Sequence, residues 1–378
     1  MIFSILIFII TILILIVIHE VGHFLLAKRF NIKVLEFGFG IPPRIFGKKI
    51  GETLVSLNWL PFGGFVKLLG EDEVNKKILE NHRSFAAQKV SKRITVVVAG
   101  VLMNLAFAWM LFYIVLGNQG FKFQLPLILD HKFLGVSQTV ESFVLIAQVA
   151  EDSPAQKAGL KKGERILTIN NQAIKDSEDL IQKTKDLAGQ EIKLTLSDPK
   201  KQQERSVNII PRVDPPQGQG AMGIALTPFR LANLKYQTPL QIVFAGPIHS
   251  LNLTLYSGKI LGKLIDESLR QKTLEPISHS VAGPVGITSL ANMVLTSKNP
   301  LLPYLDFVGL LSLNLAIVNL LPFPALDGGR LFFLLIEATT RKKVHAEVER
   351  WIHTIGMVIL LTLILLITFS DIQKLFLR

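Results

Sequence analysis

The sequence predicts a multi-span α-helical membrane protein with four transmembrane helices and a small β-rich domain. The chain is too apolar for an ordinary soluble enzyme, since 49% of its 378 residues are hydrophobic and its mean hydropathy is +0.42. Long apolar runs occur near both ends, whereas residues 140–227 have the composition of a soluble domain. The chain has no cysteine, so any metal site must use histidine, aspartate or glutamate.

The four apolar runs define the predicted spans. Residues 1–30 are expected to be a transmembrane helix rather than a signal peptide, because they lack a charged start and a small-residue cleavage site. The other three spans are predicted within residues 93–118, 301–330 and 351–378, each long enough to cross a bilayer.

Basic residues predict the orientation of these spans. Residues 28–93 contain 13 Lys/Arg against 6 Asp/Glu, while residues 118–300 contain 21 against 16 over a much longer stretch. The positive-inside rule therefore places loops 31–92 and 331–350 in the cytoplasm, and both termini with residues 119–300 outside it. Because the net charge of +12 is concentrated at membrane ends, we expect no nucleic-acid partner.

Residues 240–265 are the ambiguous stretch of this topology. They are long enough to span, but polar residues and a proline interrupt them: Gln241, Pro247, His249, Asn252, Lys259 and Lys263. We predict that residues 228–300 form an amphipathic interfacial region, with a fifth span as the alternative.

An HEVGH motif at residues 19–23 follows directly on the first apolar run. On a helix, His19 and His23 share one face and can ligate one Zn²⁺. Glu20 is then placed to accept the proton of an attacking water. Ionisable groups in a membrane helix are costly and mark function, which disfavours the alternative of interfacial histidines beside a snorkelling glutamate.

Two histidines leave a catalytic zinc site incomplete, because such sites usually have three protein ligands. Asp306 lies near the outer end of the third span, and Glu337 lies beyond its inner end. Asp327 follows two helix-breaking prolines and precedes two glycines that allow close backbone approach. Irregular backbone at membrane depth is tolerated where it lines an enclosed or wet cavity. Asp327 is the predicted third ligand.

The soluble stretch also contains a recognisable motif. Residues 153–170, SPAQKAGLKKGERILTIN, resemble the pattern of PDZ domains, and residues 140–227 have the length of one such domain. Residues 119–139 are interpreted as a linker. The alternative is another small β-rich domain.

Taken together, the motifs resemble the site-2 protease family, in its RseP-type bacterial branch. HExxH, LPFGGFVK (60–67), AGVLMN (99–104), GPVGI (283–287) and NLLPFPALDGG (319–329) occur in the family's order over nearly the whole chain. Val101 replaces a usual proline, Arg330 stands where many members have histidine, and there is one PDZ domain instead of two. The first two departures affect no ligand, whereas the third leaves the way substrates are size-filtered open.

The resemblance implies a zinc-dependent endopeptidase that cuts within transmembrane segments. The implied partners are membrane proteins with a single transmembrane segment, such as trimmed anti-sigma factors or remnant signal peptides, and also the bilayer and substrate chain ends bound by the PDZ domain. The implied location is the bacterial inner membrane, with the PDZ domain extracytoplasmic and the site towards the cytoplasm.

A helical substrate must unwind before it is cut, and its exposed backbone needs new partners. The amides of Asn314 and Asn319 are candidates, with hydrogen bonding between helices as their alternative role. A second candidate partner for the substrate backbone is the strand-like stretch around Gly38 and Gly40, together with residues 53–57. The resemblance implies that they form a membrane-associated cytoplasmic β-hairpin, which would pair with substrate by strand addition.

Two other classes compete with the protease. A catalytically silent membrane scaffold bearing a PDZ domain would be favoured by loss of a ligand or of Glu20, and none is lost. A transporter would be favoured by paired, repeated broken helices, whereas this sequence has one break and no repeat.

Overall fold

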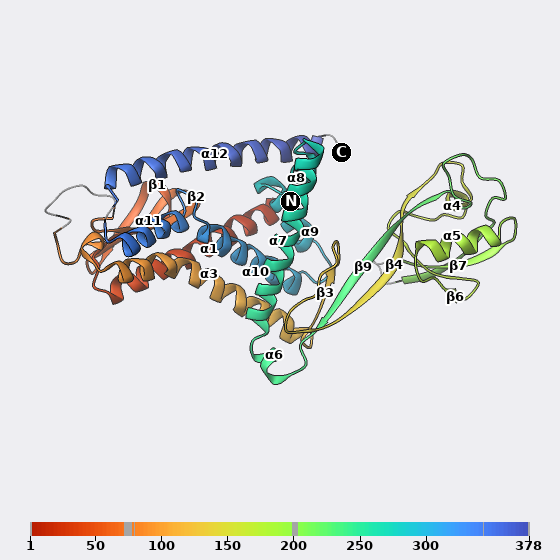
Figure 1. Cartoon of the computed structure of the whole chain (residues 1–378), viewed down its shortest axis with the longest axis horizontal. Coiled ribbons are helices and arrows are strands. Elements are labelled where there is room, and N and C mark those ends of the chain that lie inside the picture. Colours follow the sequence, from red (N-terminus) through yellow and green to blue (C-terminus); the bar gives the residue numbers. More distant parts are fainter. Residues whose placement is uncertain (1, 72–77, 79, 199–202, 343, 377–378) are drawn as a thin grey trace. The chain divides into compact units, whose positions relative to one another are not determined.

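The computed structural model describes residues 2–71, 78, 80–198, 203–342 and 344–376. They form two compact units (Figure 1). The first consists of Met1–Asn118 and Val243–Arg378, and the second is Gln119–Ile242.

Four described helices of the first unit are long and apolar enough to cross a membrane. They are α1 (Ile2–Arg29), α3 (Val90–Asn118), α10 (Leu301–Leu320) and α12 (Ala346–Phe376). This confirms the predicted number of candidate spans. In Figure 1 the start of α1 and the end of α12 lie at one end of this helix group, and the β1–β2 sheet lies at the other.

The third span ends where the sequence predicts a break. Leu321 adopts an extended conformation before Pro322, as residues preceding proline prefer, and α10 stops there. Helix α11 (Asp327–Thr340) begins six residues later with its acidic first residue at the positive end of the helix dipole. Residues 331–340, which belong to the predicted cytoplasmic loop 331–350, are part of this helix. They stay helical because α11 has an inward apolar face, from which Leu334 is buried.

A hydrophobic core joins the elements at the HExxH end of α1. The buried side chains come from α1, the sheet, α3, α11 and the segments that connect α1 to the sheet and the sheet to α3. They are Ala27, Ile32, Val34, Leu68, Phe85, Val96, Val97 and Leu334. Burial of each large aliphatic side chain contributes about 1.5–3 kcal/mol. This core therefore fixes the relative positions of the helices that carry the predicted ligands.

The sheet of the first unit consists of two long strands, β1 (Val34–Ile50) and β2 (Thr53–Leu68). Both bend, so that residues 36–39 pair with residues 54–57 on one side and with residues 64–67 on the other. Residues 44–50 pair only with residues 53–58. The outer edges of the sheet are therefore residues 44–50 and residues 64–68.

The region predicted as interfacial, residues 228–300, starts within strand β9 (Ile224–Lys235). Its helices are α6 (Pro239–Val243), α7 (Ala245–Gln271), α8 (Glu275–Ser280) and α9 (Pro284–Leu295). Helix α7 is not among the candidate spans. It packs closely against α3, because a Cβ at Gly246 would lie 2.4 Å from the carbonyl oxygen of Trp109. Figure 1 shows α7 running across the direction of the four long helices.

The second unit is a β domain. Its strands are β3 (Lys122–Pro126), β4 (Ser137–Val149), β5 (Arg165–Ile169), β6 (Gln172–Ala173), β7 (Ile192–Asp198), β8 (Gln203–Ile209) and β9 (Ile224–Lys235). The order is β3-β9-β4-β5-β7-β8, with β6 beside β5. Helices α4 (Pro154–Lys157) and α5 (Ser177–Asp186) complete the domain, and Ile146, Leu180 and Leu194 are fully buried in its core.

The PDZ-like motif forms the turn around α4. The Ser153 hydroxyl accepts a hydrogen bond from the N–H of Gln156 and caps this helix. Gly159 and Gly163 have positive φ angles of 72° and 89°, a conformation that glycine adopts without strain. The unit also includes residues 119–139, the predicted linker, because β3 and the start of β4 pair with β9.

Candidate active site

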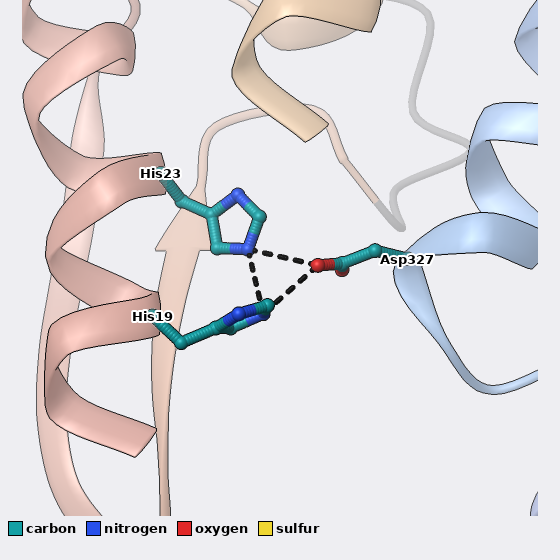
Figure 2. A group of neighbouring side chains, drawn as sticks. All are labelled: His19, His23 and Asp327. Carbon is teal, nitrogen blue, oxygen red and sulfur yellow. Dashed lines mark hydrogen bonds and ion pairs between the residues drawn. The ribbon is translucent and has the colours of Figure 1, made fainter. Parts of the chain in front are cut away.

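The three predicted metal ligands converge on one point (Figure 2). The Oδ2 atom of Asp327 lies 2.9 Å from Nε2 of His19 and 3.2 Å from Nε2 of His23. The two Nε2 atoms are themselves 3.2 Å apart. His19 and His23 project from α1, and Asp327 is the first residue of α11. Two segments about 300 residues apart in the chain therefore supply one cluster.

Both histidines are oriented by contacts from α3. The Nδ1–H of His23 donates to the carbonyl oxygen of Val96 at 2.8 Å, which leaves its Nε2 as a lone-pair donor towards the cluster. The side-chain amide of Asn104 lies 3.3 Å from Nδ1 of His19. With the amide turned so that its oxygen faces His19, Asn104 accepts the Nδ1–H and orients that ring in the same way.

Glycines let the helices approach this closely. A Cβ at Gly100 would lie 2.4 Å from Nε2 of His23 and 2.8 Å from Nε2 of His19, so the position of Gly100 forms the floor of the cluster. A Cβ at Gly22 would lie 2.4 Å from the carbonyl oxygen of Ala99. The AGVLMN segment of α3 therefore packs directly against HEVGH, with no room for a side chain at either glycine.

The proline break places Asp327. Gly328 and Gly329 sit against the backbone of residues 320–324, where a Cβ would approach carbonyl oxygens to 2.0 and 2.5 Å. Ala325 has a positive φ of 78°, which is strained for a residue with a side chain. Its N–H donates to Nδ1 of His353 on α12 at 2.9 Å. The sequence did not point to His353, because nothing near it in the chain resembles a site motif.

The cluster fits a zinc ion. Tetrahedral zinc with ligand bonds of about 2.0–2.1 Å has ligand–ligand distances of roughly 3.3 Å, close to the three distances observed here. The Oδ2 atom of Asp327 is buried and has no hydrogen-bond donor in the described residues. Two imidazole lone pairs and a carboxylate oxygen facing one point repel each other unless a cation lies between them.

Glu20 lies beside the cluster and next to the sheet. It is within electrostatic reach of His19, His23 and Asp327. A Cβ at Gly64 would lie 3.3 Å from Cγ of Glu20. The outer edge of the sheet at residues 64–68 therefore passes the predicted catalytic carboxylate.

The predicted substrate-binding glycines have a different environment. The backbone of Gly38 already pairs with Ser56 on one side and Phe65 on the other. The carbonyl oxygen of Gly40 accepts a hydrogen bond from Asn58 at 3.1 Å. The φ of Gly40 is 81°, a conformation that glycine adopts without strain. This placement favours residues 64–68, rather than Gly38 or Gly40, as the edge open to another strand.

Asn314 and Asn319 lie on α10 but not on one face of it. They are five residues apart, which turns their side chains about 140° from each other. Asn314 is exposed and Asn319 is half-buried. Within the described residues neither amide forms a side-chain hydrogen bond, so hydrogen bonding between helices does not account for either.

An HExxH helix closed by an aspartate from a second helix, within a group of membrane-length helices, defines a membrane-bound zinc metallopeptidase. The chain belongs to peptidase family M50, whose model matches residues 7–363. A Clostridium acetobutylicum protein assigned as a zinc metalloprotease is 30% identical over 98% of this chain and 97% of its own. Zinc metalloprotease RasP of Geobacillus kaustophilus is 28% identical over 95% of both chains.

Two further proteins are similar to this chain or to a part of it. The regulator of sigma-W protease RasP of Bacillus subtilis is 27% identical over 95% of this chain and 96% of its own. Among solved structures, the PDZ domain of an SdrC-like protein from Listeria monocytogenes is 21% identical, with a TM-score of 0.20, over 26% of this chain and 94% of its own. The family and the sequence relatives confirm a zinc metalloprotease of the site-2 type.

Proposed function

We propose that this metalloprotease hydrolyses peptide bonds within transmembrane segments of single-span membrane proteins, and that Glu20, His19, His23 and Asp327 form its active site. The observation that carries the proposal is the convergence of the two histidines and Asp327 beside Glu20, inside a group of membrane-length helices. A soluble substrate would not need a site in this position.

The residues of the site have separate tasks. His19, His23 and Asp327 hold the metal, and Val96 and Asn104 keep the two imidazoles in the ligating orientation. When bound, zinc supplies Lewis acidity towards the substrate carbonyl and the attacking water. Glu20 accepts the proton of that water and delivers it to the leaving amine.

The open edge of the sheet is the proposed substrate guide. A substrate strand that pairs with residues 64–67 of β2 would have its backbone held extended beside Glu20, since Gly64 faces that side chain. Gly38 and Gly40 then act behind this edge, by allowing the sheet to bend. The exposed amide of Asn314 is a second proposed partner for unwound substrate backbone.

The sheet is proposed to enter the membrane from the cytoplasmic side. The end that contains the Pro42-Pro43 turn carries exposed apolar side chains, namely Ile41, Ile45, Phe46, Trp59 and Leu60. The opposite end, at Glu52, makes ion pairs with Lys28 and Arg83. An apolar end and a charged end are what a reentrant element at a membrane surface requires.

This orientation gives the proposed location, a bacterial cytoplasmic membrane with the PDZ-like domain outside and the active site towards the cytoplasm. Helix α7 is proposed to lie on the outer surface, because exposed leucines such as Leu251 and Leu255 face away from its contact with α3. The name of the Bacillus subtilis relative supports trimmed anti-sigma factors as substrates, with remnant signal peptides as a second class.

The catalytic proposal is tested with Glu20→Gln. Purified wild-type protein should cleave a single-span model substrate, and the variant should lose roughly 10²–10⁴-fold in rate while keeping one zinc per chain and its fold. A Glu20→Gln variant that cleaves at the wild-type rate would refute the assigned role. Failure of the wild-type protein to cleave any single-span substrate would refute the proposed substrate class.

The orientation is tested with reporter fusions. Fusions after Asn75 and Arg341 should report cytoplasm, and a fusion after Lys200 should report the exterior. Lys272 follows α7 and should report the same side as Lys200. Opposite results for Lys272 and Lys200 would show that α7 crosses the membrane.

The PDZ-like domain is proposed to act as a gate that keeps untrimmed substrates from the site. It lies outside the membrane in this orientation and cannot take part in catalysis directly. Removal of residues 140–227 should then allow cleavage of substrates with intact ectodomains. If the domain instead docks newly exposed chain ends, the same deletion slows cleavage of trimmed substrates. Unchanged rates for both, in a folded zinc-containing variant, would exclude both roles.

A further inference from the structure

We infer that Glu71 and Arg330 form a positioning pair that fixes the substrate-guiding edge of the sheet relative to the metal-binding helix. Neither residue belongs to HExxH or ligates the metal. The inference rests on the proposed function, because it gives these residues a task only if substrate pairs with β2. The proposed task is to keep the β2 edge of the sheet at a fixed distance from helix α11, and neither residue takes part in the hydrolysis itself.

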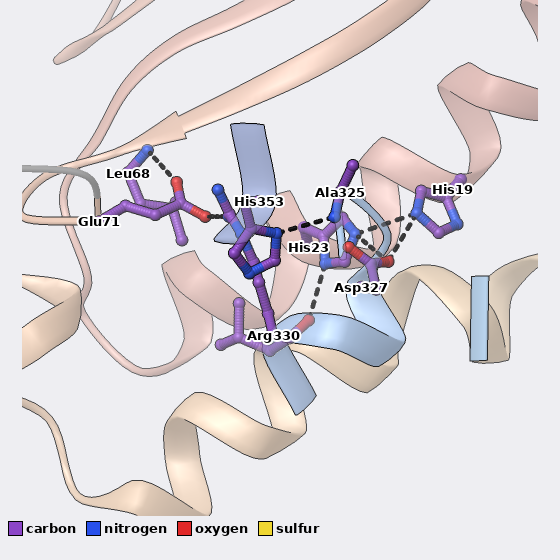
Figure 3. A network of polar contacts seen from close by, with 9 residues as sticks. His19, His23, Leu68, Glu71, Ala325, Asp327, Arg330 and His353 are labelled. Atoms are coloured by element: carbon purple, nitrogen blue, oxygen red, sulfur yellow. Dashed lines mark hydrogen bonds and ion pairs between the residues drawn. The ribbon is translucent and has the colours of Figure 1, made fainter. Parts of the chain in front are cut away.

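The pair connects two elements that must act on one peptide bond. Glu71 lies three residues after the end of β2. Its Oε2 accepts a hydrogen bond from the N–H of Leu68, the last residue of that strand, at 3.3 Å. Its Oε1 accepts from the guanidinium of Arg330, which is three residues after Asp327 on α11. Figure 3 shows Glu71 between the strand end and Arg330, with Asp327 facing the histidines on the other side.

These contacts close a ring around the site. Along β2, Gly64 lies against Glu20, and Leu68 is held by Glu71. Along α11, Arg330 and Asp327 share the first turn. A shift of the sheet relative to α11 would therefore move the bound substrate away from Glu20 and the metal together. Misplacement by about 1 Å can lower the rate of a reaction roughly a hundredfold.

The geometry also explains why this pair can hold. The Glu71 side chain is 14% exposed and that of Arg330 is 35% exposed, so the ion pair is partly shielded from water. A guanidinium presents a rigid set of donors, which makes it better suited than an ammonium to fix a carboxylate in one place. The sheet has another linked carboxylate, Glu36, which is 16% exposed and pairs with Arg44 of the same sheet. The Glu36–Arg44 ion pair lies within the sheet and does not connect it to α11, so Glu36 is a matched control.

The test compares Glu71→Gln, Arg330→Gln, their double variant, Arg330→Lys and the control Glu36→Gln in the full-length protein. We expect each single glutamine variant at position 71 or 330 to keep its zinc and to lose roughly ten- to a hundredfold in kcat, with a smaller change in KM. The double variant should be no worse than either single variant, and Arg330→Lys should recover part of the loss. Glu36→Gln should stay within about twofold of wild type.

A distance measurement separates positioning from chemistry. Because the chain lacks cysteine, spin labels can be attached at Lys67→Cys on β2 and Thr339→Cys on α11, both exposed positions. The distance distribution should be narrow in the otherwise unchanged protein and broader with Glu71→Gln, with or without zinc, and unchanged with Glu36→Gln. The inference would be overturned if the losses in kcat of the two single variants added up in the double variant. It would also be overturned if Glu71→Gln kept full activity and a distance distribution as narrow as that of the protein with Glu71. Absence of cleavage by the wild-type protein would instead overturn the proposed function.

Discussion

Two parts of the membrane unit differ strongly in how tightly they are packed. One is the contact of α1 with α3 at the HExxH end, and the other is the long helix α12. In α3, 44% of the most apolar stretch is buried, against 6% in α12. Around His19 and His23, glycines bring backbones and rings together with no space for a methyl group. Along α12 the apolar side chains are mostly exposed, including Leu361, Leu365 and Phe369.

The contrast shows where precision is needed. A metal site tolerates displacements of only a few tenths of an ångström, so its helices are fixed by backbone contacts and by oriented hydrogen bonds. The middle of helix α12 exposes an apolar surface, and the described contacts of the helix concentrate near its two ends. Near one end His353 supports the break at Ala325, and near the other Asp371 contacts α9.

The largest expected effect comes from removal of a ligand. His23→Ala or Asp327→Ala would leave two of the three proposed protein ligands, which is too few for a stable catalytic zinc site. Each variant should lose both its zinc and its cleavage activity, as measured by metal analysis of purified protein and by the single-span cleavage assay. Stoichiometric zinc in either variant would remove that residue from the site.

Gly100→Ala should have the next largest effect, because it tests the packing rather than the ligands. The new methyl group would lie 2.4 Å from Nε2 of His23 and 2.8 Å from Nε2 of His19, next to the proposed metal position. Zinc content and activity should both fall severely, although no ligand is changed. Gly262→Ala is the matched control, since a Cβ there meets nothing within 4 Å. Full zinc binding by Gly100→Ala would show that the α1–α3 contact is looser than described.

The sequence predicted which three side chains lie together, His19, His23 and Asp327, but not their surroundings. Spacing on a helix placed His19 and His23 together, and the proline break singled out Asp327. The segment containing Gly100 was recognised as a motif, yet spacing alone does not tell which face of α3 meets α1. Which edge of the sheet is open depends on how β1 and β2 bend and on their pairing register. That register cannot be predicted from the local sequence around Gly38.

Asn104→Ala is expected to have a moderate effect that sharpens the same comparison. Without the amide, Nδ1 of His19 loses its partner on α3, and the ring is no longer held in the ligating orientation. Loss of such an outer contact typically lowers metal affinity 10- to 100-fold. Competition with a zinc chelator should therefore strip this variant at lower chelator concentration than wild type, while saturating zinc restores activity. An unchanged chelator titration would contradict the assigned role of Asn104.

The smallest expected effect concerns the attachment of α12. Asp371 is buried, and its Oδ2 accepts the N–H of Gly286 in the first turn of α9 at 2.8 Å. A carboxylate in this position caps the helix and interacts favourably with its dipole, which is worth about 1–2 kcal/mol. Asp371→Ala should lower the free energy of unfolding in detergent by about 1–2 kcal/mol, seen as a lower Tm, and leave the zinc content unchanged. Leu365→Ala, on the exposed face of α12, is the control and should have almost no effect. If Asp371→Ala removed zinc, α12 would have to be as closely coupled to the metal site as α3 is, and the contrast between the two helices would fail.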